Sequence, residues 1–398
     1  MNVPKLRFKE FNDEWQSINL ADIFQYFSTN SFSREQLSES GILKNLHYGD
    51  IHRKYNSIVN ENKEITSYVK DINYVNKYEL LKNNDLIFAD ASEDHEGIGK
   101  AVEVVNVNNN TVSGLHTILA RDNSNVFAPM FKGYYFNSPI VHNQIRVLAN
   151  GFKIYGISKE AINKLNIKIP SIKEQSKIAN TFYLFDKKIE LQNKKIEDLK
   201  LFKKGLNKNI FSNFNAKYKI DELIKEYNQK TSKNNQFEVL SSTANGIILQ
   251  NEYFNKQAAS LDNTGYKIVP FGFITYRSMS DTGEFHFNIQ NITENGIVSP
   301  AYPVFEINED IVDKTYFIYY INENKSFKNK ILSLKEGGTR YALSMSKFKE
   351  INLDLPPLEF QKKCSKLLNT YNRKSKNEEN KLNKLQKLKK GLMQNMFV

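Results

Sequence analysis

The chain has 398 residues, more than one hydrophobic core usually serves, so two or more domains are expected. Its formal net charge of +12 favours an anionic partner, nucleic acid ahead of a membrane, because no run of 18 apolar residues is present. The first ten residues lack the apolar stretch of a secretory signal, and the single cysteine, Cys364, excludes an intramolecular disulfide, so a cytoplasmic protein is expected.

Residues 1–160 are predicted to form a compact α/β domain. The apolar and β-branched runs Asp85–Ala89 and Lys100–Val105 are typical of short strands, and the asparagine cluster Asn108–Asn110 is typical of a turn. Residues 161–213 follow as a separate helical region. In that region a short strand, Leu165–Ile169, ends at Pro170, a residue that favours the start of a helix.

A single long helix is predicted from Lys173 to Phe211. Its apolar residues recur by threes and fours, as in the seam of a coiled coil. They are Ile178, Phe182, Phe185, Ile189, Ile196, Leu199, Leu206 and Ile210. At about 1.5 Å per residue this helix would be roughly 60 Å long, too long to pack inside one globular domain, so a partner helix is expected.

Residues 214–347 are predicted to form a second α/β domain, with strands at Phe271–Tyr276 and Thr315–Tyr320. Residues 348–398 again show a short apolar strand, Ile351–Leu355, followed by proline and a long helical pattern. The apolar residues of this second helix are Cys364, Leu368, Tyr371, Leu382, Leu385, Leu392 and Met396.

The second half of the chain repeats the first at an offset of 186 residues. Lys203-Lys204-Gly205-Leu206 recurs as Lys389-Lys390-Gly391-Leu392, and the same offset pairs Tyr155 with Tyr341 and Ser92 with Ser278. The expected fold class is therefore α/β (α+β), with two globular domains joined by two long antiparallel coiled-coil helices about a pseudo-two-fold axis. Two independent amphipathic helices are the alternative. Because the globular parts have diverged more than the helices, the pattern suggests one scaffold carrying two different readers.

The positive charge is concentrated in the two helical segments. Residues 173–211 hold ten lysines against five acidic residues, and residues 359–398 hold eleven basic against three acidic residues. The remaining chain has 35 basic and 36 acidic residues, so its net charge is −1. Net charge therefore does not show that the globular domains bind nucleic acid, and a solvated helix face explains the basic helices at least as well as phosphate contact.

Signals for catalysis, metal binding and cofactor binding are weak. There is no Walker A sequence, the six histidines show no metal spacing, and one cysteine cannot build a zinc site. Asp354-Leu-Pro-Pro-Leu358 superficially resembles the Asp-Pro-Pro-Tyr stretch of amino-methyltransferases, but its repeat counterpart, Lys168-Ile-Pro-Ser-Ile172, lacks the acid. We therefore predict a chain without intrinsic catalysis, metal or cofactor.

Candidate DNA contacts are polar, basic and aromatic residues in loops that recur in both copies, because loops on a rigid scaffold carry recognition. One loop precedes the strand that ends in proline, and its glycines let a ligand approach closely. The basic side chains and shared tyrosine suit phosphate or base-edge contacts, although an ordinary turn with a packed tyrosine is the alternative. The candidates here are Lys153 and Tyr155 in the first copy and Thr339, Arg340 and Tyr341 in the second.

Two further groups complete the candidate set. Different side chains at equivalent positions are what two readers of different sequences would need. This second loop contributes Ser92 and His95 in the first copy and Arg277, Ser278, Ser280 and Thr282 in the second. The densest basic and aromatic cluster of the first domain, which surface solvation explains nearly as well, is Lys44, Asn45, His47, Arg53, Lys54 and Tyr55.

Over its whole length the chain resembles the specificity subunit of a type I restriction-modification system. The opening Pro4-x-Leu6-Arg7-Phe8-x-x-Phe11-x-x-x-Trp15 is similar to the way many members begin. The proline strands with Gln175 and Gln361, and the helix-ending Lys-Lys-Gly-Leu-x-x-Asn-Ile/Met-Phe, look like the shared regions of the family. The second copy has no obvious counterpart of the Trp15 opening, which leaves its start near Ala216 open.

The resemblance implies a non-catalytic subunit that binds double-stranded DNA and holds two methyltransferase subunits, to which restriction subunits can be added. Each globular part would be a target recognition domain that reads one half of a bipartite asymmetric site, and the helices would set the gap. Half-sites centred about 10 base pairs apart would present the same face of DNA. Two alternatives stay open: the recognition arm of a fused or type II-like restriction-modification enzyme, and a coiled-coil scaffold that reads no DNA.

Overall fold

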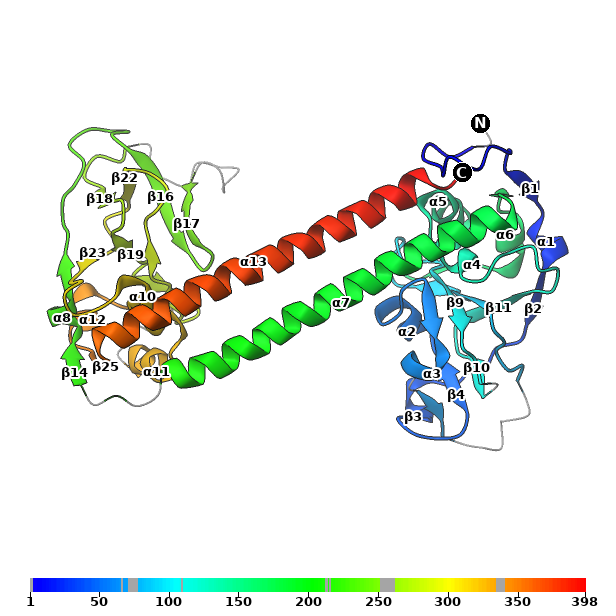
Figure 1. The fold of residues 1–398 in the computed structure, drawn as a ribbon, viewed down its shortest axis with the longest axis horizontal. Helices are drawn as coiled ribbons and strands as arrows, with labels where there is room; N and C mark the ends of the chain where they lie inside the picture. The colour runs from blue at the N-terminus through cyan, green and yellow to red at the C-terminus, as the bar shows by residue number, and fades with distance from the viewer. Residues whose placement is uncertain are drawn as a thin grey trace. The chain divides into compact units, whose positions relative to one another are not determined.

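The computed structural model describes residues 3–65, 67–70, 78–108, 110–211, 214, 216–250, 262–333 and 341–398. The chain divides into two compact units (Figure 1). Unit 1 comprises Met1–Lys194 together with Glu379–Val398, and unit 2 comprises Lys195–Glu378. Each unit therefore contains one globular domain and a part of both long helices, so the helices belong to the cores of the domains as well as linking them along the chain.

The two long helices lie where the sequence predicts them. Helix α7 spans Ile172–Ile210 and helix α13 spans Leu358–Asn395, and each follows a short strand and proline. The strands are β13 (Ile167–Ile169) and β25 (Asn352–Leu355). Buried Gln175 donates from Nε2 to the carbonyl of Pro170 at 2.9 Å, and Gln361 does the same to Pro356 at 2.8 Å. These glutamines bind the first turn of each helix to the strand before it.

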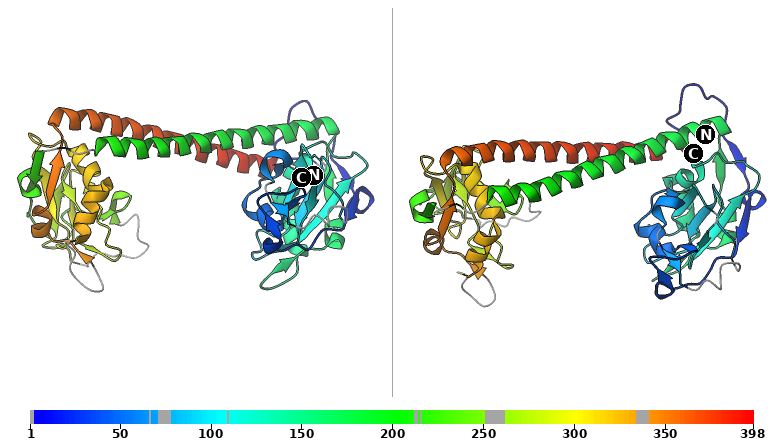
Figure 2. Two further views of the ribbon diagram at one scale, coloured as in Figure 1. Left: turned by 90° about the horizontal axis from the view of Figure 1, so that it is seen from below. Right: turned by 60° about the horizontal axis from the view of Figure 1, so that its bottom comes forward.

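In unit 1 the start of α7 runs antiparallel to the end of α13, as both views of Figure 2 show. The Phe182 ring stacks on Phe397 with centroids 5.6 Å apart, and one turn further along α7, Asp186 pairs with Lys389. In unit 2 the end of α7 lies against the start of α13, where Phe202 stacks on Tyr371 at 6.4 Å.

The domain of unit 1 is built on a five-stranded sheet in the order β2-β11-β7-β9-β5. These strands are β2 (Phe24–Phe27), β11 (Thr117–Asp122), β7 (Leu86–Ala89), β9 (Ala101–Val105) and β5 (Ile58–Asn60). The predictions at Asp85–Ala89 and Lys100–Val105 are thus confirmed as β7 and β9. All four residues of β7 are buried, because the sheet is covered on both faces.

Helices α4 (Phe131–Phe136) and α5 (Pro139–Leu148) contribute to the core on one face of this sheet. The rings of Phe88, Phe131 and Phe136 pack there with Trp15 and with Phe397 from the end of α13. On the other face Ile87, Val102 and Val104 pack against Ile51 and Tyr55, next to a four-stranded sheet. Its order is β10 (Thr111–Ser113), β4 (Lys44–Leu46), β6 (Tyr68–Val69) and β3 (Leu37–Ser38).

Short elements complete unit 1. The helices are α1 (Leu20–Ile23), α2 (Tyr48–Arg53), α3 (Glu61–Glu64), α6 (Lys159–Asn163) and the 3-10 turn η1 (Arg34–Gln36). Strand β1 (Gln16–Ile18) pairs with β13, and β8 (Ala91–Ser92) pairs with β12 (Tyr155–Gly156).

Unit 2 repeats this plan with one sheet in the order β15-β23-β19-β21 and another in the order β17-β16-β22-β18. The first comprises β15 (Ile224–Glu226), β23 (Val304–Ile307), β19 (Ile274–Thr275) and β21 (Asn288–Ile289). The second comprises β17 (Gly246–Leu249), β16 (Glu238–Thr243), β22 (Asn295–Val298) and β18 (Lys267–Pro270). The remaining strands are β14 (Ala216–Lys219), β20 (Met279–Ser280) and β24 (Tyr341–Ala342). The helices are α8 (Ile220–Leu223), α10 (Lys314–Glu323), α11 (Lys325–Ser333) and α12 (Met345–Lys349).

Strand pairing locates the start of the second copy, which the sequence left open. Gln16 lies opposite Ile169 in the β1–β13 pair, and Ala216 lies opposite Leu355 in the β14–β25 pair. The second copy therefore begins at Ala216. Because Ala216 follows Gln16 by 200 residues while Leu355 follows Ile169 by 186, the offset changes along the repeat and a constant offset misses this start.

Two predictions in the second domain are corrected. Thr315–Tyr320, predicted as a strand, lies in α10, where Tyr316, Phe317 and Tyr320 are buried at helical spacing and Asp313 caps the first turn. The pairing of Ser92 with Ser278 is wrong by two residues, because Tyr155 lies opposite Ser92 whereas Tyr341 lies opposite Ser280. Of the predicted strand Phe271–Tyr276 only β19 forms, since Gly272 adopts a φ of +84°.

Across the described residues, no helix combines the length and apolar character needed to cross a membrane.

Candidate nucleic-acid interface

In unit 1 the short β8–β12 pair brings two of the candidate loops together. Ser92 is buried at the pairing position opposite Tyr155, and its Oγ accepts the backbone N–H of Asp94 at 3.2 Å. The His95 ring packs edge-on against Tyr155 with centroids 4.9 Å apart, and its Nε2 lies 3.1 Å from the carbonyl oxygen of Arg146. Ser92 therefore shapes the turn, while His95 and Tyr155 form part of a loop surface.

Lys153 lies on a projecting hairpin, Asn150–Gly156. The hairpin is closed by two backbone hydrogen bonds between Asn150 and Gly156, at 3.0 and 2.8 Å. Lys153 is exposed, and beside it the side chain of Phe152 is 99% exposed. Sequence reasoning selected Lys153 and Tyr155 from this loop and missed Phe152, although a phenylalanine between glycine and lysine was visible in the sequence.

The C-terminal end of α2 adds two basic side chains to this surface. Arg53 and Lys54 are exposed, and Lys54 lies 3.3 Å from Asp50. Their neighbour His52 lies with Nε2 2.9 Å from the carbonyl oxygen of Ala91, which joins α2 to β8. We call the exposed residues Arg53, Lys54, His95, Phe152 and Lys153, together with Tyr155, the loop surface of unit 1.

Four of the predicted contacts are instead part of the interior. Buried Lys44 pairs with Glu61 at 2.8 Å, and Asn45 accepts from Asn30 at 2.7 Å. Tyr55, also buried, donates its hydroxyl to the carbonyl of Glu64 at 3.1 Å. Together with the helix cap His47, these side chains organise the region behind α2, so their burial removes them from the DNA-contact set.

His47 caps helix α2 from a buried position. Its Nδ1 accepts the backbone N–H of Gly49 at 3.1 Å, which requires a neutral ring. Burial lowers the pKa of His47 to about 4, and the neighbouring Arg34 lowers it further in the same direction. The imidazole is therefore a structural acceptor at neutral pH.

Acidic side chains near the loop surface are largely engaged within the protein. Glu96 pairs with Arg146, and Asp94 accepts the backbone N–H of Gly97. Asp90 lies 3.3 Å from Nδ1 of His116, and burial raises its pKa. Glu93 is exposed on the same turn. These pairings reduce the negative potential that would otherwise oppose a phosphate backbone.

In unit 2 the corresponding loops surround a hollow of about 320 Å³. Arg277 and Thr282 are exposed at its edge, while Ser280 is buried and accepts the N–H of Gly283 at 3.0 Å, as a turn residue. Ser278 donates to the carbonyl of Ala301 at 2.5 Å. Further lining residues are Ser241, Ser242, Thr243, Glu284, His286 and Tyr302.

Tyr341 is half-buried, opposite Ser280 and against Gly283. Thr339 and Arg340 lie outside the described residues. The hollow therefore offers one guanidinium, several hydroxyls and an imidazole, groups that donate to and accept from base edges.

The two loop regions share a backbone framework and differ in the side chains they expose. Ser92 and Ser280 hold equivalent turns, and Tyr155 and Tyr341 lie opposite them. Beyond this frame unit 1 presents lysines, a histidine and a phenylalanine, whereas unit 2 presents Arg277 and hydroxyl groups. Searching the described residues finds no group of three His, Cys, Asp or Glu side chains that could hold a metal ion.

Comparison with known proteins agrees with this arrangement. The family model described as "Type I restriction modification DNA specificity domain" matches residues 12–201 and again residues 210–387, one match for each copy of the repeat. A relative named as the type I restriction enzyme MjaX specificity subunit, from Methanocaldococcus jannaschii, is 23% identical over 401 residues, with 92% of this chain and 89% of the relative covered.

Solved structures are similar in fold. The S subunit of a type I restriction-modification system from M. genitalium matches with a TM-score of 0.59 and 16% identity, covering 100% of this chain and 99% of that one. A chain from a structure of complex assembly and conformational transition in the type I system matches with a TM-score of 0.52 and 12% identity, covering 95% and 96%. With two family matches spanning both repeats, the chain belongs to the type I restriction-modification DNA specificity family.

Proposed function

We propose that the chain is a non-catalytic specificity subunit in which each unit reads one half of a bipartite, asymmetric site in double-stranded DNA. The observation that carries the proposal is the repeated frame with different exposed side chains. Ser92 and Tyr155 recur as Ser280 and Tyr341, whereas Lys153 and His95 of unit 1 have no basic counterpart in the described loops of unit 2 at the same frame positions. Two similar frames with different side chains suit two different base sequences.

We also propose that a methyltransferase subunit binds each unit at a glycine on the long helices. Gly205 in α7 and Gly391 in α13 occupy the same place in the repeat, and a Cβ added to either would meet no described atom within 4 Å. A glycine in a helix interior costs about 0.5–1 kcal/mol relative to alanine. Because the described chain itself does not need the missing side chain, close approach of a partner gives the physical reason for glycine in both copies.

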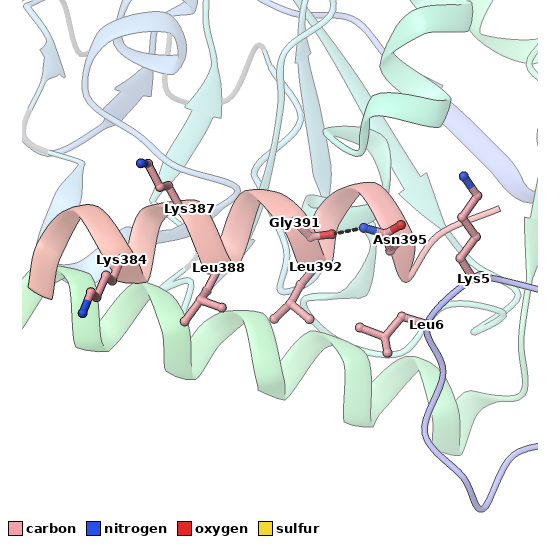
Figure 3. Close-up of a pocket in the computed structure, with 8 residues that line it drawn as sticks. All are labelled: Lys5, Leu6, Lys384, Lys387, Leu388, Gly391, Leu392 and Asn395. Carbon is pink, nitrogen blue, oxygen red and sulfur yellow. Dashed lines mark hydrogen bonds between the residues drawn. The ribbon is translucent and has the colours of Figure 1, made fainter.

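The surroundings of Gly391 in unit 1 support this binding site. Leu6, Leu388 and Leu392 point into a common groove of about 720 Å³, and Asn395 donates to the carbonyl of Gly391 at 2.7 Å (Figure 3). The side chains of Lys5, Lys384 and Lys387 border it. An apolar floor with a basic border suits an amphipathic segment that carries acidic residues. One such site in each unit would fit two methyltransferase subunits for each chain.

The test is methylation by the chain together with the methyltransferase encoded beside it. Sequencing of DNA treated with both proteins is expected to show methylated adenine within a two-part sequence, and neither protein alone should produce it. Methyl transfer by the chain alone would refute the non-catalytic assignment. Methylation without any sequence preference would instead favour a scaffold that reads no DNA. Since the substrate is cellular DNA, we place the complex in the cytoplasm.

Changing Arg277 to Ala should weaken recognition of only one half-site. If its guanidinium contacts a base, the loss is expected to be about 1 to 3 kcal/mol and to be greatest for changes within that half-site. Competition binding with duplexes altered in one half at a time measures this. Lys225→Ala, which removes an 83% exposed side chain of β15 outside the hollow, is the matched control. An equal loss on all sequences would identify Arg277 as a phosphate contact.

A further inference from the structure

The side chain of Phe152 has an exposure that the folded chain does not explain. It is 99% exposed, more than Phe271 at 62% or Phe202 at 53%, and Ile154 at the same hairpin tip is 64% exposed. We propose that Phe152 enters the DNA duplex as a wedge and opens one base step in the half-site read by unit 1. This inference rests on the proposed function, because it needs DNA bound at the loop surface of unit 1.

The hairpin holds Phe152 in a defined position. Two backbone hydrogen bonds close it at Asn150 and Gly156, and the next residue, Ile157, donates its N–H to the carbonyl of Asp90 at 2.9 Å. At the tip Gly151 adopts a φ of +130°, and a Cβ there would lie 2.0 Å from the carbonyl oxygen of Ile154. The turn therefore requires glycine, and it presents the next side chain outward from a fixed base.

The chemistry around Phe152 favours DNA over a protein partner. Lys153 is adjacent, and Arg53 and Lys54 lie on the same loop surface, where they can contact phosphates on either side of an inserted ring. The main acidic neighbour on α5, Glu96, is paired with Arg146. Apolar wedges such as phenylalanine and isoleucine are used by DNA-binding proteins to unstack a base step, at a cost of about a few kcal/mol.

The wedge is expected in only one half of the site. At the repeat offset of 186 residues, Phe152 corresponds to Gly338, which has no side chain to insert. The proposal therefore predicts an opened base step in the half-site of unit 1 and none made by the corresponding position of the second copy. Such asymmetry would add indirect readout, since flexible pyrimidine–purine steps open more easily than others.

The test uses the complete chain bound to its methyltransferase and a duplex that carries the methylated two-part sequence. The fluorescent base 2-aminopurine is placed in turn at each position of both halves except the target adenine, which the methyltransferase itself can unstack. Wild-type protein should raise the fluorescence at one step of one half-site. Phe152→Ala should abolish that rise and weaken binding by about 10- to 100-fold, the range expected for loss of one stacking contact.

Two variants separate the wedge from a structural effect. Phe152→Leu keeps an apolar wedge and should retain most of the fluorescence rise. Val147→Ala removes another strongly exposed apolar side chain of unit 1, 84% exposed on α5, and should leave both binding and fluorescence unchanged. Because the Phe152 side chain lacks internal contacts, the thermal unfolding midpoint of Phe152→Ala should equal that of the wild type.

Three outcomes would overturn the wedge. They are full binding by Phe152→Ala, absence of any bright step outside the target adenine in the wild-type complex, and loss of methyltransferase association by Phe152→Ala without DNA. The last would identify Phe152 as a protein contact. If instead the wild-type complex methylates no two-part site, the proposed function itself fails, and this result is distinguishable because it needs no variant.

Discussion

At the scale of single residues, His47 makes the stability of unit 1 depend on pH. Its pKa lies near 4 in the folded chain and near 6.5 when unfolded, so between these values the unfolded state binds more protons. Stability should therefore rise with pH from about 4 to 6.5, by on the order of 1 to 2 kcal/mol from this residue. Urea unfolding of wild type at pH 4.5 and 7 measures the effect.

His47→Asn supplies the matched control, because asparagine can accept the N–H of Gly49 as a helix cap but does not titrate. The variant should lose part of the difference in stability between pH 4.5 and 7. Charged and titratable neighbours of His47, namely Arg34, Asp50 and His116, are present in both proteins and cancel in the comparison. Identical pH profiles would show that the folded state does not hold His47 neutral.

The same residue marks a limit of sequence reasoning about the site. Lys44, Asn45, His47 and Tyr55 form a basic and aromatic cluster in the sequence, yet they are buried. Their partner Glu61 lies at the start of α3, and Asn30 lies in the loop after β2. Composition alone cannot distinguish a surface patch from an internal polar network whose partners are brought in by the fold.

At the scale of elements, the end of α13 is a structural part of unit 1. Phe397 is 5% exposed and packs on Trp15, Phe131, Tyr135 and Phe182 with ring centroids 5.5 to 6.5 Å apart. Phe397→Ala should destabilise unit 1 by about 3 to 5 kcal/mol, the usual cost of emptying a buried phenylalanine site. Urea unfolding measures this loss, with Phe360→Ala, a 37% exposed control on α13, expected to cost far less. A loss below about 1 kcal/mol would show that the last turn frays without consequence.

The glycines of the long helices give a prediction in which stability and binding change in opposite directions. Gly205→Ala and Gly391→Ala should each raise the unfolding free energy by up to about 1 kcal/mol, because alanine has the higher helix propensity. Each should also weaken methyltransferase binding to its own unit. Thermal unfolding of the free chain and calorimetric titration with methyltransferase separate the two effects. Lys362→Ala, exposed on α13, is the control, and unchanged affinity in both glycine variants would contradict the proposed binding site.

How far the sequence predicts an element depends on how many of its features agree. Helices α7 and α13 have proline starts, a buried glutamine at the same place and a long periodic pattern, and both were predicted within a few residues. Helix α10 reads Lys-Thr-Tyr-Phe-Ile-Tyr-Tyr, a composition typical of a strand. Burial of Tyr316, Phe317, Tyr320 and Ile321 against the domain core decides for the helix, and that packing is not visible in a six-residue run.

At the scale of the whole molecule, the repeat has equivalent contacts that a constant offset hides. Lys389 pairs with Asp186 and lies over the Tyr134 ring in unit 1, whereas Lys203 pairs with Glu323 and lies over Tyr319 in unit 2. The first lysine of Lys-Lys-Gly-Leu thus fixes the end of each long helix to the domain that helix does not follow directly in sequence. Sequence reasoning found the tetrapeptide but could not assign this contact.

The two units differ in one covalent link, and this difference leads to a final prediction. In unit 2 the end of α7 is joined through a few residues to β14, the first strand of that domain. In unit 1 the end of α13 and the N-terminal segment are separate, and the N–H of Leu6 donates to the carbonyl of Asn395 at 2.9 Å. The same position is thus covalent in one unit and held by contacts in the other.

A circular permutant should therefore fold and read the same DNA. A short glycine-serine linker would join Val398 to the N-terminus, and the chain would be opened between Phe211 and Ala216. Because each unit keeps all its described contacts, we expect the same methylated sequence and a thermal midpoint within a few degrees of wild type. Opening the chain inside β7, a fully buried strand, is the control that should prevent folding. Loss of methylation of one half-site alone would show that the link before Ala216 positions unit 2 in a way that noncovalent contacts cannot replace.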